Sequence, residues 1–577
     1  MKILIILLVL FASCASKPSK PVDTTTPCTY ADYYKQRPDV QAAGIDAFAH
    51  YTSNGKSEGM CRPINVGEIC TYAEYYRRRP DVQAAGLDAF EHYTANGKNE
   101  GMCYPLQVNI KCLDDAFDGK VGSLKSIDIP VDFNGRPSFG DLNNDGAPDL
   151  IVANRDRIAA YTVCGENLWS ENYKTNWDYG GHYFWNLTTF GYIGDADGDG
   201  KSEFLHFSSD WRTLVIRDGA TGKIEKTIGL AGGTKWMYVF LARRSGESGS
   251  TATRVIVASP SYQRDVYIAS LDIRQANYKL EWTYHNNTSN QGNFVYLSPQ
   301  AANLDGQHGD EIFFGTIALN ENGHLIWMAD ANSYTQNRGV HASTVKDLDP
   351  TSPGLESVFS VYVPNGNNPS IFAYGAATGN REKWRAYSPH SEKHPHQHTV
   401  GDFEPQRSGL EVLMRNGNGF NHWMTDGAGN IIRPNWRVNP GWQGSGEYVQ
   451  GIEWDHLEGT EVMAIERHVG FSGANAKRSR YSIISPINNN VIVPAFGGGI
   501  MEAPTWVGKS NNNNLNPYES GVIAVDLIGD GREEVLTWGN RKFTIYYNSG
   551  NAKVNKRWGN SDYMSLKKIS CPLYSPR

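Results

Sequence analysis

Short apolar runs recur along residues 110–577, and each follows a loop rich in acidic and amide side chains. The first example is FGDLNNDGAPDLIVAN (residues 139–154), in which aliphatic residues begin where the polar loop ends. Apolar runs of about four to eight residues, bounded by glycine, proline and asparagine, are typical of buried β-strands. The pattern therefore predicts a mainly β domain in which loops of one kind lead repeatedly into strands.

Seven copies of this loop carry a carboxylate eight or nine residues after their first polar residue. The copies begin at residues 141, 195, 303, 347, 402, 453 and 526, so 108 residues separate the second copy from the third. That gap is twice the 54-residue step between the first two copies. It predicts an eighth unit around residues 239–260 that has lost its acidic loop.

Alternating carboxylate and amide oxygens in a short curled loop are the ligands of a hard cation such as Ca²⁺. A polar turn without an ion is the alternative for any single copy, but the repetition favours calcium as a structural cofactor. We expect the loops that begin at Asp141 and Asp195 to bind best. The candidate ligands are Asp141, Asn143, Asp145, Asp149, Asp195, Asp197, Asp199, Glu203, Asn303, Asp305, Glu311, Asp347, Asp349, Glu356, Asp402, Glu404, Glu411, Glu453, Asp455, Glu461, Asp526, Asp530 and Glu534.

A second pattern follows several of these loops. Segments such as VIRDGATGKIEKT (residues 215–227) and LNENGHLIWMA (residues 319–329) hold two β runs around a glycine-containing turn, which indicates a hairpin. A loop, a strand and a hairpin make a four-stranded propeller blade, and closure of the blades into a ring leaves few exposed edges. The sequence predicts an eight-bladed β-propeller over residues 110–577, with seven blades as the alternative.

The residues before the propeller contain a leader and a tandem repeat. Residues 1–14 have the apolar run of an export signal, and Cys14 lies where a lipoprotein carries its lipidated cysteine; a plain cleaved signal is the alternative. A linker at residues 15–27 precedes two repeats, residues 28–61 and 70–103. Their apolar spacing predicts short helices that stop at Asn-Gly.

These repeats resemble small modules appended to bacterial exported proteins. They are either spacers or ligand-binding modules that use Tyr33, Tyr34 and His50.

Cysteine spacing predicts disulfides in an exported protein. Cys28 with Cys61 and Cys70 with Cys103 would each close one repeat, since 33 residues separate the two cysteines in both cases. Cys112 and Cys571 flank the propeller, so we expect them to pair and latch the ring, which leaves Cys164 as a free thiol. A Cys112–Cys164 pair is the competing arrangement.

Composition limits the partners. The net charge is −7 and no basic run occurs, which excludes nucleic acid as an expected partner. Aromatic residues make up 12% of the chain, which suits carbohydrate stacking as well as core packing. We expect a monomer that contacts a membrane only through a lipid anchor, as an outer-membrane lipoprotein, a cell-surface protein or a secreted protein.

Several motifs resemble one family. The segments SNQGNFVYLSPQAANLDGQHGDEIFFGTIALNENGHLIW (residues 289–327), VHASTVKDLDPTSPGLESVF (residues 340–359) and DLIGDGREEVLTW (residues 526–538) resemble the propeller of rhamnogalacturonan lyases of polysaccharide lyase family 11, with FG-GAP-like calcium loops. The resemblance implies an exported eight-bladed propeller with bound Ca²⁺. It also implies an acidic plant-type or bacterial polysaccharide as partner, cleaved by β-elimination.

The chain departs from the family at some positions. Phe294 and Gly531 stand where the family has histidine and tryptophan, and His341 is the only histidine left before the DLDP loop. Two function classes therefore remain open: a polysaccharide lyase, and a non-catalytic FG-GAP-type surface propeller that binds glycan or protein in adhesion.

β-Elimination beside a uronate needs a base, an acid and a group that neutralises the carboxylate. Suitable residues precede two neighbouring acidic loops, which would place them on the same rim of the ring. A transition-metal site built from His394, His396 and His398 is one alternative, because alternation along a strand would put them on one side; a solvated histidine-rich loop is another. The candidate catalytic residues are His341, His398, His396, Arg338 and Tyr334.

Overall fold

The computed structural model describes short stretches of residues 27–105 and most of residues 124–548. Outside residues 27–105, its longest gaps are residues 1–26, 106–123, 175–190, 287–298, 330–339, 437–445, 468–478, 497–520 and 549–577. The chain divides into two compact units, Met1–Leu106 and Gln107–Arg577. None of the helices in the described part of the chain has the length and apolar character needed to cross a membrane.

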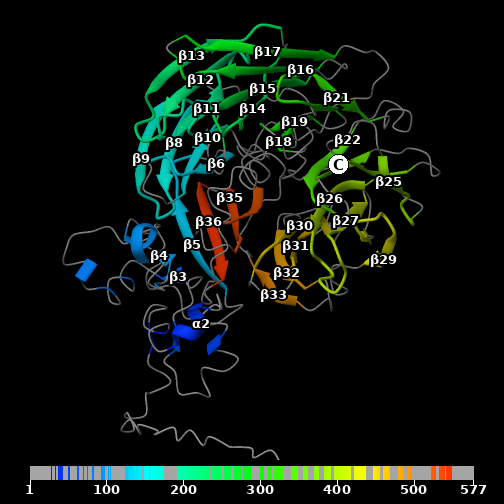
Figure 1. Ribbon diagram of the computed structural model, residues 1–577. Helices are drawn as coiled ribbons and strands as arrows, with labels where there is room; N and C mark the ends of the chain where they lie inside the picture. The colour runs from blue at the N-terminus through cyan, green and yellow to red at the C-terminus, as the bar shows by residue number, and fades with distance from the viewer. Residues whose placement is uncertain are drawn as a thin grey trace, which may run out of the picture. The chain divides into compact units, whose positions relative to one another are not determined.

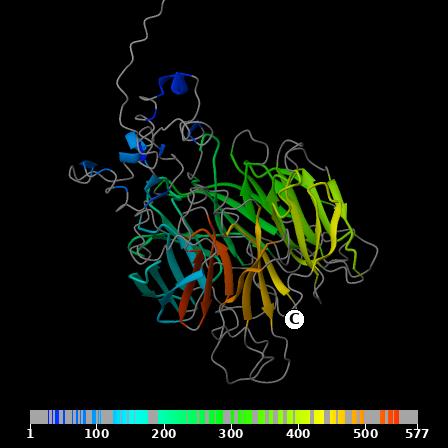
Figure 2. The same cartoon turned by 90° about the horizontal axis from the view of Figure 1, so that it is seen from below.

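The second unit contains eight four-stranded antiparallel sheets among its described residues, which we number as blades 1 to 8 (Figures 1 and 2). Blade 1 holds β6 (Arg136–Gly140), β7 (Asp149–Ala153), β8 (Arg157–Thr162) and β9 (Asn167–Asn172). Blade 2 holds β10 (Tyr192–Gly194), β11 (Glu203–Phe207), β12 (Thr213–Asp218) and β13 (Ile224–Gly229). Blade 3 holds β14 (Tyr238–Ala242), β15 (Arg254–Pro260), β16 (Val266–Asp272) and β17 (Lys279–Asn286). Blade 4 holds β18 (Gln300–Ala302), β19 (Glu311–Phe314), β20 (Ile317–Leu319) and β21 (Leu325–Met328).

The remaining blades follow the same order. Blade 5 holds β22 (Val340–Lys346), β23 (Glu356–Val361), β24 (Ile371–Gly375) and β25 (Glu382–Ala386). Blade 6 holds β26 (Pro395–Gly401), β27 (Glu411–Asn416), β28 (His422–Thr425) and β29 (Ile431–Trp436). Blade 7 holds β30 (Gly446–Ile452), β31 (Glu461–Arg467), β32 (Ser479–Ile484) and β33 (Val491–Phe496). Blade 8 holds β34 (Gly521–Val525), β35 (Glu534–Gly539) and β36 (Lys542–Asn548), completed by β5 (Leu124–Pro130).

Blade 8 joins the two ends of the unit. β5 pairs with β36 from Leu124 opposite Asn548 to Pro130 opposite Lys542, and Figure 1 shows these two strands side by side. The first strands of successive blades contact one another from β6 through to β34, so they lie inside the ring. The mainly β propeller is thus confirmed, and each of the eight repeat units corresponds to one sheet, including the unit at residues 239–260 that lacks an acidic loop.

The antiparallel order gives the ring two different faces. The loop between the first and second strands and the hairpin between the third and fourth strands leave every blade on one face, which we call the loop face. The turn between the second and third strands and the connection to the next blade lie on the opposite face, which we call the junction face. The acidic loops therefore lie on the loop face, and the chain enters each inner strand from the junction face.

Tryptophans connect neighbouring blades on the loop face. The indole nitrogen of Trp169 on β9 donates a hydrogen bond to the carbonyl oxygen of Gly219 in the hairpin of blade 2, at 2.7 Å. In the same hairpin, Gly222 has φ +72°, and a Cβ atom there would lie 2.5 Å from the Trp169 ring. Only glycine therefore fits this turn. Trp282 bonds to Glu321 (2.9 Å) and Trp384 bonds to Gly427 (2.7 Å) in the same way.

The first unit contains two parallel strand pairs among its described residues. β1 (Pro27–Cys28) pairs with β2 (Arg62–Pro63), and β3 (Ile69–Cys70) pairs with β4 (Tyr104–Pro105), so the two ends of each repeat lie together. The described helical segments are α2 (Pro38–Ala42) and a π-helical turn, η2 (Tyr93–Gly97), which ends at the Asn-Gly stop. Cys61 and Cys103 lie outside the described residues, so both disulfides stay predictions.

The aromatic residues of the repeats belong to their cores. Tyr33 is fully buried, and its hydroxyl lies 2.8 Å from Nδ1 of His50, which is 7% exposed. Tyr75 and His92 repeat this contact in the second module at 2.9 Å. The alternative that used Tyr33 and His50 to bind a ligand is therefore wrong, because these side chains face each other and not solvent. Tyr34 lies outside the described residues.

The structure also corrects the cysteine assignment. Cys164 is disulfide-bonded, so its prediction as a free thiol is wrong; the competing pair with Cys112 stays a prediction. Cys112 and Cys571 both lie outside the described residues. Cys14 and the predicted export signal also lie there, so lipidation stays a prediction.

Candidate functional site

Buried carboxylates recur at one position of the blades. In seven blades the second strand begins with an acidic residue that pairs with the last residue of the first strand. These residues are Asp149, Glu203, Glu311, Glu356, Glu411, Glu461 and Glu534. All except Glu461, whose side chain lies outside the description, are at most 4% exposed. Burial of so many carboxylates requires hydrogen bonds or positive charge close by.

Backbone amides supply part of that compensation. In five blades the buried carboxylate accepts a hydrogen bond from the N–H of the second loop residue and so folds the loop back onto the strand. The donors and acceptors are Leu142 to Asp149 (3.0 Å), Ala196 to Glu203 (2.7 Å), Leu348 to Glu356 (2.9 Å), Phe403 to Glu411 (2.9 Å) and Leu527 to Glu534 (2.7 Å). These carboxylates therefore have a structural role even before any ion is considered.

One group in the described residues fits a cation. In blade 2, oxygen atoms of Asp195, Asp197 and Glu203 all lie within 4.8 Å of one another. Burial, and then the negative charges of Asp197, Glu225 and Asp195, raise the pKa of Glu203 to about 8. Three carboxylates this close repel one another, and their oxygen atoms are suitable ligands for a hard divalent cation.

The loop backbone holds this group in place. The carboxylate of Asp195 accepts hydrogen bonds from the amides of Gly198 (2.7 Å) and Gly200 (3.0 Å). Gly198 and Gly200 have φ +80° and +86°, a region in which glycine is favoured. Asp199 was also expected as a ligand, but it lies outside the group. Its carboxylate accepts the amide hydrogen of Lys201 at 2.8 Å instead.

Five of the other acidic loops are described only in part, and the loop of blade 6 is described completely. Asp145, Asp305, Asp349, Asp455 and Asp530 lie outside the described residues. Glu404, another predicted ligand, is instead bound by two arginines: Nε of Arg407 and Nε of Arg433 each lie 2.5 Å from its carboxylate. Burial raises the pKa of the neighbouring Glu411 to about 7. Within the described residues, the acidic loop of blade 2 is therefore the one whose carboxylates are grouped closely enough to bind a cation.

A different feature marks the junction face of blades 5 to 7. The pairing of the inner strand with the second strand skips one residue in each blade: between Val340 and Ala342, between Pro395 and Gln397, and between Gly446 and Tyr448. The skipped residues are His341, His396 and Glu447. Each lies six residues before its acidic loop. Such β-bulges redirect side chains and occur often beside active sites.

The three bulges lie on adjacent strands, since β22 contacts β26 and β26 contacts β30. The backbone thus brings His341 and His396 to equivalent places, as expected for candidate catalytic residues. Glu447 was not among the candidates, although it stands six residues before Glu453 just as His396 stands six before Asp402. The shared offset was the signal that could have found it.

His398 differs from the two bulge histidines. It lies on β26 opposite Met414, it is 4% exposed, and burial lowers its pKa to about 3. The side chain is therefore neutral at physiological pH and cannot neutralise the carboxylate of a uronate. The bulge also breaks the strict alternation on which the transition-metal alternative relied. Tyr334, Arg338 and His394 lie outside the described residues.

Two exposed cations lie on the junction face between blades 2 and 3. The ammonium nitrogen of Lys235 is 5.2 Å from the ring centroid of Trp211, which has the unusual φ of +59°. The neighbouring Asp210 fixes the turn by accepting hydrogen bonds from the amides of Arg212 (2.8 Å) and Thr213 (2.9 Å). Neither Arg212 nor Lys235 forms an ion pair with a carboxylate in the described part of the chain.

These observations define the class as a β-propeller with carboxylate-rich loops on one face and bulged inner strands on the other. Residues 240–412 match the model of rhamnogalacturonan lyase family 11, C-terminal domain. The resemblance that the motifs indicated is thereby confirmed.

Two curated proteins of Bacillus subtilis (strain 168) are similar in sequence. Rhamnogalacturonan exolyase YesX is 26% identical over 287 residues, which are 39% of this chain and 44% of YesX. Rhamnogalacturonan endolyase YesW is 25% identical over 333 residues, which are 48% of this chain and 50% of YesW. The matched region thus spans about half the length of these relatives.

Solved structures share the fold. The exotype lyase YesX superposes with a TM-score of 0.57 at 17% identity, covering 77% of this chain and 80% of YesX. A rhamnogalacturonan lyase of Bacillus licheniformis gives a TM-score of 0.53 at 20% identity, with 77% of each chain covered.

Proposed function

We propose that this protein is an exported, calcium-stabilised propeller that cleaves an acidic, uronate-containing polysaccharide by β-elimination. The observation that carries the proposal is the placement of His341, His396 and Glu447 at equivalent bulges on three adjacent inner strands. Two of the three lie within the segment that matches the lyase family. The names of the similar Bacillus subtilis proteins support rhamnogalacturonan as the substrate class.

The chemistry needs a base for the proton beside the uronate carboxyl group and an acid for the leaving oxygen. We assign these roles to the bulge residues, because imidazole and carboxylate side chains exchange protons near neutral pH. The exposed cations Arg212 and Lys235 lie on the same face, where they would attract the carboxylates of the glycan. Their role is substrate binding.

Calcium has a separate role in this proposal. Asp195, Asp197 and Glu203 offer only oxygen donors, which Ca²⁺ prefers. Their loop leaves blade 2 on the loop face, whereas the bulges lie at the opposite ends of the inner strands. We therefore assign the ion to stabilising the fold and not to the reaction.

The alternative is a propeller that binds glycan without cleaving it. It is favoured by Phe294 and Gly531, which replace a histidine and a tryptophan of the lyase motifs. In this alternative Arg212 and Lys235 would hold the glycan, and the bulge residues would have no catalytic role.

Absorbance at about 235 nm, where an unsaturated uronate absorbs, tests the proposal with a panel of uronate glycans. Glu447→Gln and His396→Ala should each lower the rate at least about 100-fold, the usual contribution of a general acid or base. Glu166→Gln and His324→Ala are matched controls, since both side chains are exposed in hairpins on the loop face, and they should keep full activity.

The outcomes separate the two functions. A product that still forms at the wild-type rate in both bulge variants would refute the catalytic assignment. No product from any glycan, together with retention that falls on replacing Arg212 and Lys235 by alanine, would establish the binding alternative. Fatty-acid labelling of the wild-type protein but not of Cys14→Ala would show the proposed lipid anchor, and its absence would refute that part.

A further inference from the structure

Blade 3 reverses the charge at both positions where the other blades carry carboxylates or amides. Arg243 follows β14, at the place that Asp195 takes after β10 in blade 2. Arg254 begins β15 and pairs with Ala242, just as Glu203 begins β11 and pairs with Gly194. Two arginines therefore occupy the first loop position and the first strand position of this blade.

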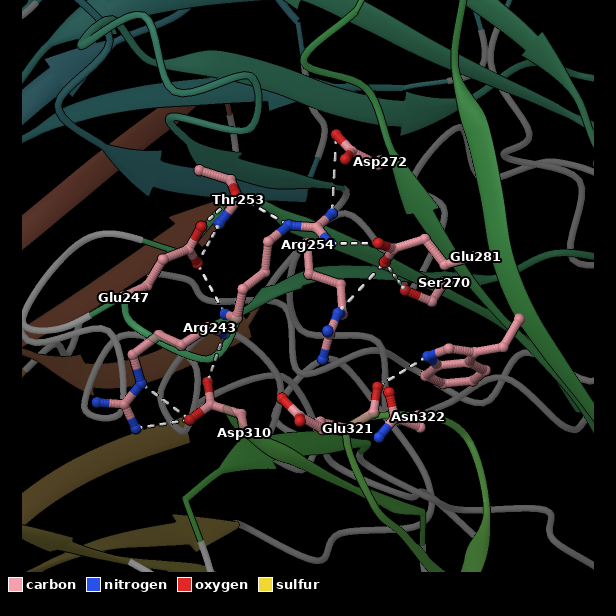
Figure 3. A network of polar contacts seen from close by, with 12 residues as sticks. Arg243, Glu247, Thr253, Arg254, Ser270, Asp272, Glu281, Asp310, Glu321 and Asn322 are labelled. Carbon is pink, nitrogen blue, oxygen red and sulfur yellow. Dashed lines mark hydrogen bonds and ion pairs between the residues drawn. The ribbon is translucent and has the colours of Figure 1, made fainter. Parts of the chain in front are cut away.

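Arg243 connects blade 3 with blade 4. Its guanidinium donates to Asp310 from Nε at 2.8 Å and from Nη2 at 2.6 Å, and its amide donates to the same carboxylate at 2.7 Å (Figure 3). The amide of Asp310 in turn donates to the carbonyl oxygen of Arg243 at 3.0 Å. Asp402 and Thr460 make the equivalent pair of hydrogen bonds between blades 6 and 7, and Glu453 and Glu533 make it between blades 7 and 8. The link itself is therefore general, and blade 3 adds the guanidinium group.

Glu247 takes over the hydrogen bond that the strand carboxylate makes elsewhere. The amide of Arg244, the second loop residue, donates to Oε2 of Glu247 at 2.8 Å. The amide of Thr253 donates to the same oxygen at 3.2 Å. Glu247 lies inside the longer loop of this blade, so the loop is closed by a carboxylate of its own while the strand position is free for Arg254.

The guanidinium groups of Arg244 and Arg254 connect the loop and β15 with β17. Arg244 donates to Glu281 on β17 through Nη1, and to Oγ1 of Thr253 through Nε at 3.2 Å. Nε of Arg254 on β15 lies 3.3 Å from the same Glu281, which also accepts a hydrogen bond from Ser270 on β16 at 2.8 Å. Figure 3 draws the contacts that reach Glu281 as dashed lines.

The charges in this network balance. The network holds four arginines and four carboxylates. Ion pairs join Arg243, Arg244, Arg254 and Arg274 to Asp272, Glu281 and Asp310, and Glu247 accepts hydrogen bonds from the backbone amides of Arg244 and Thr253. Blade 2 instead places Asp195, Asp197, Asp199 and Glu203 in one loop with Lys201 as its basic residue. Buried charge is tolerated only when it is paired, so blade 2 needs a further cation and blade 3 does not.

We infer that guanidinium groups replace the metal ion in blade 3, so that this blade is ordered without calcium while the acidic loop of blade 2 depends on it. The inference rests on the proposed calcium binding of the other loops. It implies that removal of calcium loosens the ring unevenly, with strands β14 to β17 as a stable segment.

Hydrogen exchange read by mass spectrometry tests this on the full-length protein in Ca²⁺ and in EGTA. Amides of residues 195–207 should exchange at least about tenfold faster in EGTA, whereas amides of residues 238–247 and 266–286 should change less than twofold. Equal loss of protection in both blades would overturn the inference.

If EGTA changes exchange nowhere, the proposed calcium binding is refuted. The role of the guanidinium groups is then still tested by a variant. Arg244→Gln should then still raise exchange in residues 238–286, and added Ca²⁺ should not restore protection. Lys201→Gln, an exposed residue of the blade 2 loop, is the control and should leave blade 3 unchanged. Wild-type protection of blade 3 in Arg244→Gln would refute the role of the guanidinium groups.

Discussion

Blades 2 and 3 are neighbours with the same strand order, yet at two equivalent loop-face positions their side chains carry opposite charge. In blade 2, Glu203 begins the second strand beside Asp195 and Asp197; in blade 3, Arg254 begins it beside Glu281. The backbone pairing at this point is the same in both blades. The comparison teaches that the propeller frame accepts either sign of charge, provided that each buried charge meets a partner, which is an ion in one blade and a side chain in the other.

The largest effect is expected from Glu281→Gln in blade 3. This change leaves Arg244 and Arg254 buried without the carboxylate that they share, and breaking a buried pair costs about 3 kcal/mol. Chemical denaturation should show this loss equally in Ca²⁺ and in EGTA. A loss that appears only in EGTA would mean that a metal ion also supports blade 3.

Asp197→Asn in blade 2 should show the opposite dependence. A bound ion at a hundredfold excess over its dissociation constant stabilises the folded state by about 2.7 kcal/mol. The variant should lose most of that gain in Ca²⁺ and, since it relieves repulsion among the acids, no stability in EGTA. Thermal unfolding with and without EGTA measures both values, and equal destabilisation in the two buffers would contradict a metal site.

The two blades should also respond to pH with opposite signs. Burial raises the pKa of Glu203 to about 8 from 4.5, so in metal-free protein its stabilising contribution is present at low pH and is lost as the pH rises through about 8. The hydrogen bonds from Arg274 lower the pKa of Asp272 from 3.8 to about 2, so its contribution is lost only as the pH falls through about 2.

Hydrogen exchange in EGTA, corrected for the intrinsic pH dependence, checks this difference. Between pH 5 and pH 8.5, protection should fall in residues 195–207 and stay constant in residues 266–275. Constant protection of both segments would show that Glu203 does not control the loop of blade 2.

The smallest effect should be equal for the tryptophan that bonds to blade 2 and for the tryptophan of blade 3. Trp169→Phe and Trp282→Phe each remove one indole hydrogen bond to the hairpin of the next blade, to Gly219 and to Glu321. Each should lower the free energy of unfolding by about 1 kcal/mol, with or without Ca²⁺. Unequal losses would show that the difference between the blades extends beyond the charged loops.

The candidate site was predictable where its signal was local. The offset of six residues before an acidic loop placed His341 and His396 correctly at equivalent strand positions. His398 lies four residues before Asp402, on the regular part of β26 opposite Met414, where its side chain is buried. Which side of β26 is buried depends on how that strand packs in the ring, which the sequence of β26 alone does not reveal.

The sequence by itself determined the repeat: the eight units, their acidic loops, their hairpins and the unit at residues 239–260 without an acidic loop. Each of these features depends on neighbours a few residues apart, since turn chemistry and alternating polar positions are local properties. Only the tertiary structure decided which distant groups meet. It placed Leu124 opposite Asn548 to close the ring, put Cys164 in a disulfide, and brought Arg243 to Asp310 across 67 residues. Such contacts depend on how the blades curve around the ring, and side chains far apart in the chain compensate one another's charge only after that closure.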